Sequence, residues 1–347
     1  MVTGSRRGLA GIGTWIMDHV RLIDAWPGEQ TLANVHGEEF SGGGLAHNLV
    51  VDVARFDLGI PLEGIGFVGD DDDGRRILDL CRSLGVDSTH LLVSPDAPTS
   101  YTEVMTVQST GRRTFFHSRG ANNLVTYDTI PFDKIQSRIA HVGYLLLMDG
   151  IDAPDPEFGT VAAKILHRLQ QEGIRTSIDT ISENSERFQQ LIPPALRYTD
   201  YVILNEFEAG KTTGHAILEG EHDRASKLDA QALRDSARAL LDFGESELVV
   251  IHMAIGAYAL MRGGQEFFQP ALDLPEGYIQ GGAGAGDAFC AGVLVGIHEG
   301  WELQEGLRFG TAAAAACLGN ATCTEGVTTH AESMKLFDRF PLKPSAL

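Results

Sequence analysis

Apolar residues recur on two different spacings along this chain. Leu45, Leu49, Val53 and Phe56 lie on one face of a helix, whereas Gly64–Val68 is a short apolar run typical of a buried strand. The predicted strands are Gly8–Met17, Gly64–Val68, His141–Leu147, Arg175–Asp179, Tyr201–Leu204 and Leu248–His252, and the predicted helices are Leu45–Phe56, Gly74–Leu84, Phe158–Gln171, Ala230–Phe243, Ala285–Glu299 and Leu303–Leu318. This alternation favours an α/β fold with a mostly parallel sheet and helices on both faces.

Two stretches interrupt the alternation, because they have strand-like composition without an accompanying helix. They are Thr31–Phe40 and Ser100–Arg119, and the second contains a hairpin-turn sequence at Ser109–Arg112. We expect one domain over residues 1–347, with a small antiparallel sheet from segments of about 19–40 and 100–119. Such a sheet can close over a substrate as a lid. The alternative is a simple extension of the main sheet.

Composition narrows the class of function. The chain has 347 residues, 43% of them hydrophobic, and a formal net charge of −20. This charge disfavours binding to nucleic acid or to an anionic membrane, both of which attract basic surfaces. No apolar run is long enough for a transmembrane helix. The four cysteines show no CxxC pair and no zinc-type spacing, which suggests a reducing, cytoplasmic setting.

The most informative segment is Gly281–Asp287, where four glycines and two alanines precede an aspartate and an apolar helical run. A loop without side chains that opens a helix exposes backbone N–H groups to an anion at the positive end of the helix dipole. A carboxylate at Asp287 can then accept a proton from a hydroxyl beside a bound phosphoryl group. The alternative is a tight turn in which Asp287 only caps the helix.

Four motifs, which follow one another along the chain in the order typical of the family, resemble the ribokinase-like (PfkB) carbohydrate kinase family. They are Ser41–Asn48, Gly66–Gly74, Asn205–Glu208 and Gly284–Phe289. The resemblance covers nearly the whole chain. It implies a ribokinase-like three-layer fold with a mostly parallel central sheet and a small β-sheet lid. It also implies phosphoryl transfer from ATP, with Mg²⁺, to a hydroxyl of a sugar or sugar acid.

The resemblance assigns roles residue by residue. It implies that Asp287 is the catalytic base and that the anion-hole amides belong to Gly284, Ala285 and Gly286. The positions that would bind the sugar are Asp18, Gly43, Gly44, Asn48 and, in the lid, Arg113. For Asp18 and Asn48 the alternative is turn or helix-cap chemistry, and for Arg113 it is a solvated surface arginine.

The nucleotide side is also assigned by the resemblance. Asn205 and Glu208 would bind the cofactor, with Glu208 holding Mg²⁺ through water, and Gly256 and Thr311 would line the adenine pocket. The alternative for Asn205 and Glu208 is that they cap the helix that follows a strand.

The sequence departs from the family where Gly281 and Gly282 replace an Asp-Thr pair. Because the acidic position helps many relatives to bind a monovalent cation, dependence on such a cation is doubtful here. A nucleoside kinase on the same fold, and a non-catalytic sugar- or nucleotide-binding relative, remain alternatives. A homodimer through the lid is a further expectation from the resemblance.

Overall fold

The computed structural model describes residues 6–219, 227–345 and 347. Its central sheet has nine strands in the order β17-β16-β15-β12-β11-β8-β1-β4-β5. Their bounds are β1 Leu9–Gly13, β4 Leu62–Gly69, β5 Asp87–Ser94, β8 Ile139–Leu145, β11 Arg175–Thr180, β12 Tyr201–Asn205, β15 Leu248–Met253, β16 Gly256–Met261 and β17 Glu266–Pro270. The strands from β15 to β5 are parallel, and β16 and β17 add an antiparallel edge.

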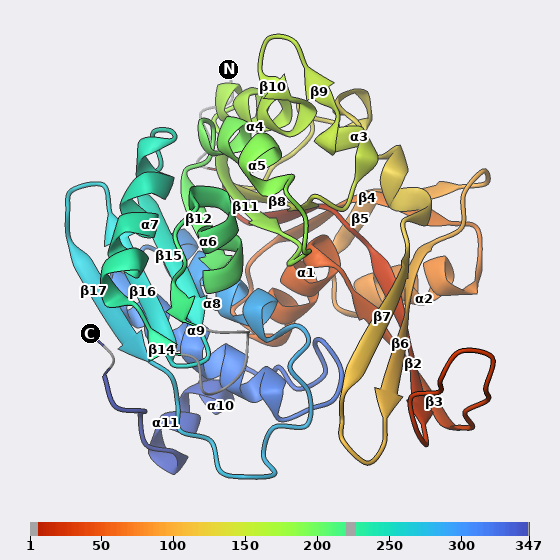
Figure 1. Ribbon diagram of the computed structural model, residues 1–347. Helices are drawn as coiled ribbons and strands as arrows, with labels where there is room; N and C mark the ends of the chain where they lie inside the picture. Colours follow the sequence, from red (N-terminus) through yellow and green to blue (C-terminus); the bar gives the residue numbers. More distant parts are fainter. Residues whose placement is uncertain (1–5, 220–226, 346) are drawn as a thin grey trace.

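Helices cover both faces of this sheet (Figure 1). One face carries α1 Leu45–Arg55, α2 Asp72–Ser83, α8 Ala285–Glu299 and α9 Leu303–Leu318, and the other carries α4 Val161–Gln171, α5 Phe188–Leu196, α6 Glu206–Thr213 and α7 Ala230–Asp242. Neighbouring residues of a strand point to opposite faces. In β12, Ile203 therefore packs with the α8 side while Val202 packs with the α4 side. This arrangement confirms the predicted three-layer α/β fold.

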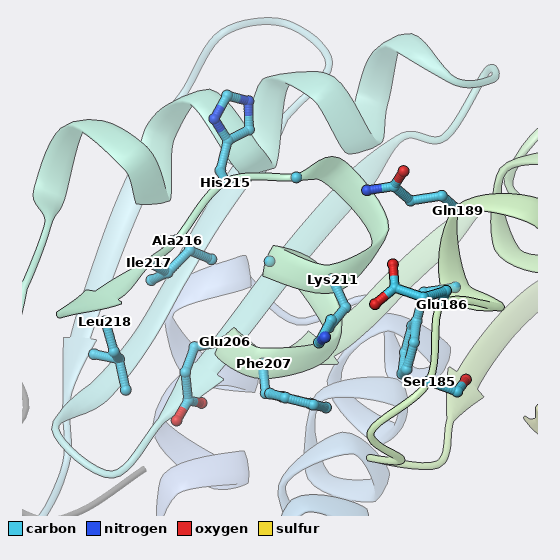
Figure 2. Close-up of a pocket in the computed structure, with 13 residues that line it drawn as sticks. Ser185, Glu186, Gln189, Glu206, Phe207, Lys211, His215, Ala216, Ile217 and Leu218 are labelled. Carbon is cyan, nitrogen blue, oxygen red and sulfur yellow. The ribbon is translucent and has the colours of Figure 1, made fainter. Parts of the chain in front are cut away.

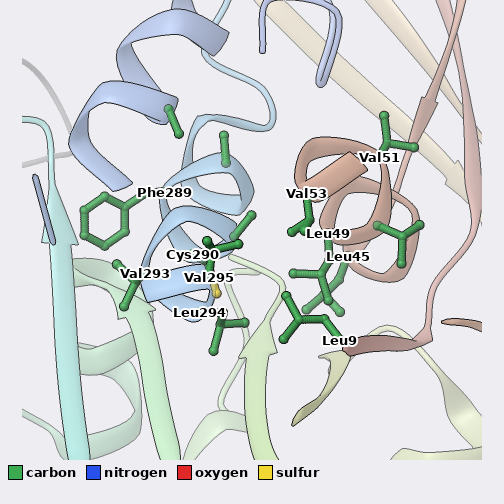
Figure 3. Close-up of a cluster of buried hydrophobic side chains, with 14 of the residues drawn as sticks. Leu9, Leu45, Leu49, Val51, Val53, Phe289, Cys290, Val293, Leu294 and Val295 are labelled. Carbon is green, nitrogen blue, oxygen red and sulfur yellow. The ribbon is translucent and has the colours of Figure 1, made fainter. Parts of the chain in front are cut away.

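The face that bears α1 and α8 forms a close-packed apolar cluster (Figure 3). Leu45 and Leu49 of α1 and Val293 and Leu294 of α8 are buried in this cluster together with Leu9 of β1. Helices α1 and α8 are therefore packed against each other, and this contact helps to position the site described below.

A second sheet of four strands, in the order β3-β2-β6-β7, projects from the body (Figure 1). Its strands are β2 Ile16–Ile23, β3 Val35–Gly43, β6 Ser100–Val107 and β7 Arg113–Ser118. We call this sheet the lid. The hairpin predicted at Ser109–Arg112 joins β6 to β7, while β2 and β6 pair in parallel.

The prediction of one strand over Gly8–Met17 is wrong. β1 ends at Gly13 in the central sheet, and β2 begins at Ile16 in the lid. The buried Thr14 lies between them, where its hydroxyl accepts a hydrogen bond from the Leu45 amide at 2.9 Å and donates to the Gly143 carbonyl at 3.3 Å. These long-range bonds interrupt an otherwise continuous apolar run. The lid consequently begins before residue 19, and its second strand is shifted from Thr31–Phe40 to Val35–Gly43.

The remaining elements are short. They are η1 Gly120–Leu124, η2 Tyr127–Thr129, α3 Asp149–Asp152, β9 Pro154–Asp155, β10 Gly159–Thr160, β13 Leu218–Glu219, β14 Lys227–Leu228, α10 His330–Met334 and α11 Leu336–Arg339. In the part of the chain that the structure describes, none of the helices combines the length and apolarity needed to cross a bilayer.

Candidate active site

The glycine-rich segment ends directly at helix α8. Gly284 takes a left-handed conformation with φ of 79°, and a Cβ atom there would lie 2.1 Å from the carbonyl oxygen of Cys323. Both the backbone conformation and the close approach therefore require glycine at this position. An α-helix leaves its first amides without intrahelical partners, so Ala285, Gly286 and Asp287 place backbone N–H groups at the opening of α8.

Asp287 lies in the first turn of α8, where two neutral donors hold its carboxylate. Asn48 Nδ2 donates to Oδ2 at 2.7 Å, and the Tyr144 hydroxyl lies 2.7 Å from Oδ1 and 2.6 Å from Oδ2. Burial raises the pKa of Asp287, and the bonds from Tyr144 and Asn48 partly oppose that rise. Since the N-cap position is Gly284, Asp287 is not the capping residue.

Tyr144 was not predicted from the sequence. Burial raises its pKa well above the ordinary value, so the phenol stays protonated and remains a donor to Asp287. Its backbone amide also lies 3.3 Å from the Thr14 hydroxyl, which ties the end of β8 to the start of α1. A tyrosine at the carboxyl end of a parallel strand was the available signal, because such ends line the sites of α/β folds.

A second acidic group lies at the ends of β11 and β12. Burial, Glu208 and Asp287 together raise the pKa of Asp179 well above its usual range, and burial raises the pKa of Glu208 to about 7. The two carboxyls share a hydrogen bond, and Ser182 Oγ also donates to Glu208 at 2.7 Å. Asp179 was missed in the sequence because it was read only as the end of a strand.

Asn205 and Glu208 also form a capping box at the start of α6. The Glu208 amide donates to Asn205 Oδ1 at 2.9 Å, and the Asn205 amide donates to Glu208 Oε2 at 3.1 Å. The capping alternative is therefore realised in the structure. Capping does not account for the burial of the Glu208 carboxyl beside Asp179 and Asp287. In the described part of the chain, neither Asp179 nor Glu208 forms an ion pair with a basic side chain that would let all three carboxyls ionise. A divalent cation fits that requirement.

The sugar-binding positions predicted from the resemblance lie where the lid meets α1. A Cβ atom at Gly43 would be 2.9 Å from Asp18 Oδ2, and the Cys323 thiol lies 3.4 Å from the same oxygen. Gly44 is the N-cap residue of α1, with φ of 87°, and Asn48 follows one turn later. The structure thus brings Asp18, Gly43, Gly44 and Asn48 to the same side of the molecule as Asp287.

Arg113 of β7 reaches the glycine-rich segment. Its Nη2 donates to the Ala321 carbonyl at 2.9 Å, and a Cβ atom at Gly281 would lie 2.5 Å from that nitrogen. Arg119, which follows β7, instead forms an ion pair with Asp149 at 2.6 Å.

A cavity of about 500 Å³ opens on the other side of the loop. Its lining includes Gly256, Thr311, Ala285, Gly286 and the His252 ring. Burial lowers the pKa of His252 to about 4, so the ring is neutral and offers a flat, uncharged wall. A size of several hundred cubic ångströms suits a cofactor. The structure thus places the predicted adenine-pocket residues beside the predicted anion hole.

Another cavity, of about 360 Å³, lies between α5, α6 and β13 (Figure 2). Figure 2 shows Lys211 and Phe207 of α6 facing Glu186 and Gln189 across it. None of the predicted site residues lines this cavity.

Asp287 lies at the start of α8, between a cavity large enough for a nucleotide and the polar face of the lid. This arrangement is typical of the active site of a phosphotransferase. The chain belongs to the pfkB family of carbohydrate kinases, because the family model described as "pfkB family carbohydrate kinase" matches residues 7–330. It is thus an ATP-dependent sugar kinase of the ribokinase-like fold.

Individual relatives are distant. The chain is 22% identical over 300 residues to a "5-dehydro-2-deoxygluconokinase" of Shouchella clausii, covering 85% of this chain and 86% of that protein. It is 25% identical over 334 residues to an "ATP-dependent ribose-1-phosphate kinase" of Halopiger xanaduensis, covering 95% and 98%. The solved Arabidopsis thaliana ribokinase complexed with ribose and ATP matches with a TM-score of 0.77 and 20% identity, covering 95% of this chain and 98% of that one.

Proposed function

We propose that this kinase transfers the γ-phosphoryl group of ATP to a hydroxyl of a sugar or sugar acid, with Asp287 as the base. The observation that carries the proposal is the position of Asp287. It lies beside the open amides of α8, with the nucleotide cavity on one side and Asp18 on the other. The kinases of Shouchella clausii and Halopiger xanaduensis described above act, by name, on a sugar acid and a sugar phosphate, which supports a small polyhydroxylated acceptor.

The geometry supports a direct transfer. The Asp287 carboxylate takes the proton of the acceptor hydroxyl, whose oxygen forms the new bond to phosphorus, while the bond to the bridging oxygen of ADP breaks. Asn48 and Tyr144 orient the carboxylate for this step. The amides of Gly284, Ala285 and Gly286 stabilise the negative charge that develops on the phosphoryl oxygens.

Asn205 and Glu208 would hold Mg²⁺ with the ATP phosphates, largely through water. Mg²⁺ typically keeps several waters and uses one or two carboxylates. Among the described residues there is no group of three or more His, Cys, Asp or Glu arranged to hold a metal. The bound ion would neutralise charge on the phosphates, and Glu208 and Asp179 would lose their shared proton beside it.

We also propose that activity does not depend on a monovalent cation. Gly281 leaves room for the Arg113 guanidinium, which donates to the Ala321 carbonyl and so brings a fixed positive charge to the glycine-rich segment. Equal turnover in potassium, sodium and tetramethylammonium buffers is expected, measured as ADP release. A strict requirement for potassium would contradict this part of the proposal.

A lid-mediated homodimer is part of the proposal as well. The lid and its connection expose Trp26, Phe115 and Phe116, which are 50%, 58% and 52% exposed, and such apolar surface is typical of an interface. Sedimentation at the assay concentration should give a dimer, and a monomer would count against it. A cytoplasmic location also belongs to the proposal, and the four buried cysteines, none of which forms a disulfide, are consistent with it.

The function is tested with purified protein, ATP and a panel of sugars, sugar acids and nucleosides, with ADP release as the readout. Turnover with a sugar or sugar acid is expected. Turnover with nucleosides alone would favour a nucleoside kinase, and ATP binding without turnover of any hydroxyl compound would favour a non-catalytic relative.

A further inference from the structure

A short segment late in the chain forms part of the wall of the nucleotide-sized cavity. Residues 341–343, which we call the strap, run antiparallel to residues 271–273, the stretch that follows β17 (Figure 1). The last residue of the strap, Lys343, lines the cavity. We propose that Lys343 is a nucleotide-binding residue whose ammonium group donates to the phosphate chain of ATP. This inference rests on the proposed nucleotide site and not on the identity of the acceptor.

The backbone of Lys343 is held in place by the fold. Its amide donates to the Ala271 carbonyl at 2.8 Å, and the Asp273 amide donates to the Pro341 carbonyl at 2.8 Å. Between these two bonds, the buried Leu272 packs against alanines of α9. The side chain of Lys343 therefore starts from a fixed point at the edge of the cavity.

The ammonium group of Lys343 has donors to spare. Nζ donates to the Ala254 carbonyl at 2.9 Å, and the side chain is half-buried. In the described part of the chain Lys343 takes part in no ion pair. Because an ammonium has three donors and no acceptor, two N–H groups remain for a ligand. A lysine binds phosphate as a compact point charge.

The ammonium lies near the end of the cavity that is formed by α8. A Cβ atom at Gly286 would lie 3.0 Å from the His252 ring, so the end of β15 contacts the opening of α8. Ala254 is two residues beyond His252, a span of at most about 7 Å. A nucleotide whose γ-phosphoryl group lies at the α8 amides would carry its other phosphates toward this turn, where Lys343 can donate to them.

The charges around the cavity give this ammonium its importance. Among the described residues that line the cavity, the other ionisable side chains are Asp273 and His252. The His252 ring is neutral, because burial lowers its pKa to about 4. Lys343 thus supplies the positive side-chain charge that a polyanion meets there, in a chain with a formal net charge of −20. Its contribution should be specific to phosphorylated nucleotides.

A second lysine of the same region provides a matched control. Lys335 lies between α10 and α11, and its ammonium pairs with Glu332 on the surface. Its side chain is 60% exposed, and it does not line the cavity. Replacing either lysine by methionine removes one positive charge and keeps an unbranched apolar side chain, so the two variants differ in the place of the lost charge.

The test measures nucleotide binding without an acceptor. Isothermal titration calorimetry with Mg²⁺ gives the Kd of ATP, ADP and adenosine for wild type, Lys343→Met, Lys343→Arg and Lys335→Met. In Lys343→Met the Kd of ATP and of ADP should rise about 10-fold, while the Kd of adenosine stays unchanged. Lys343→Arg should recover most of the lost affinity, and Lys335→Met should follow wild type.

Steady-state kinetics give a second readout. The KM for ATP should rise in Lys343→Met by the same factor as the Kd, with kcat at saturating ATP and the KM for the acceptor near the wild-type values. The melting temperature without nucleotide should also stay near that of wild type.

Unchanged binding of ATP in Lys343→Met would overturn the role of Lys343. Equal weakening of ATP and adenosine would also overturn it, because the strap would then only pack against the cavity. An equal effect of Lys335→Met would reduce it to general electrostatics and overturn it as well. If wild type binds ATP but phosphorylates no sugar or sugar acid, the proposed function fails and this inference stands. If wild type binds no ATP, both fail.

Discussion

Two acidic groups face the same site, and the surrounding side chains hold them in opposite ways. Asp287 is held by neutral donors, Tyr144 and Asn48, which leave it free to accept one more proton. Asp179 and Glu208 are held by each other, with a shared hydrogen bond and raised pKa values. A carboxylate surrounded by donors is ready for proton transfer, whereas a carboxyl pair becomes fully ionised only beside a cation.

The largest expected effect on activity comes from removing the carboxylate of Asp287. Asp287→Asn keeps the shape of the side chain and removes the base, so turnover should fall by about 10³-fold or more, in the upper range for general-base catalysis. ADP release measures this loss. ATP binding should persist, because the nucleotide cavity lies on the other side of the loop. Full activity in this variant, with an unchanged melting temperature, would remove Asp287 from the mechanism.

Removing one charge from the Asp179–Glu208 pair should instead change the concentration of Mg²⁺ that the enzyme requires. Glu208→Gln keeps an acceptor for the capping box but removes the charge, so the Mg²⁺ concentration for half-maximal activity should rise about 10- to 100-fold. A magnesium titration of the initial rate measures it. Glu206→Gln, in the same helical turn, is the matched control and should titrate like wild type. An equal shift in both variants would point to general electrostatics.

A smaller effect is expected when one donor to Asp287 is removed. The bond from Tyr144 lowers the pKa of Asp287, so Tyr144→Phe should raise that pKa. The base must be ionised, and the acidic limb of kcat/KM should therefore move to higher pH. A pH–rate profile from pH 5 to 9 measures the shift. A uniform drop without a shift would mean that Tyr144 acts only on packing.

Another buried carboxyl, that of Asp52, provides the smallest effect on activity. Neither oxygen of Asp52 has a hydrogen-bond partner among the described residues, and burial raises its pKa well above the ordinary value. Its unfolded pKa is about 3.9. Wild type should therefore lose stability as the pH rises from about 4 toward the raised folded pKa, because the native state must keep the proton or bury a charge.

Asp52→Asn removes this titration. Chemical unfolding at pH 5 and pH 8 should show the variant gaining about 1–3 kcal/mol relative to wild type at the higher pH, with near-normal kinase activity. A difference between variant and wild type that is the same at both pH values would show that Asp52 is not the titrating group.

Much of the fold was accessible from the sequence because its signals are local. The helices Ala285–Glu299 and Leu303–Leu318 have the predicted bounds. The division of Gly8–Met17 was not accessible. It depends on hydrogen bonds from Thr14 to Gly143 and Leu45, which only the folded chain brings together.

The residues of the site, too, could be predicted only where the sequence signal is local. Asp287 was found because its glycine-rich approach is a local pattern, and the resemblance supplied Asp18 and Asn48. Tyr144 and Asp179 were missed, because each becomes important through a contact with a residue far along the chain. Polar residues at strand ends are common, so position alone could not distinguish these two from ordinary surface residues.

The two-residue junction between β1 and β2 has a mechanical consequence. Thr14 and Trp15 alone separate a strand of the rigid sheet from a strand of the lid, and the Thr14 hydroxyl also holds the first amide of α1. A swing of β2 therefore pulls on the helix that carries Asn48, and through it on Asp287. The position of the lid and the alignment of the base are therefore linked through Thr14, and an inserted residue at this junction should weaken that link.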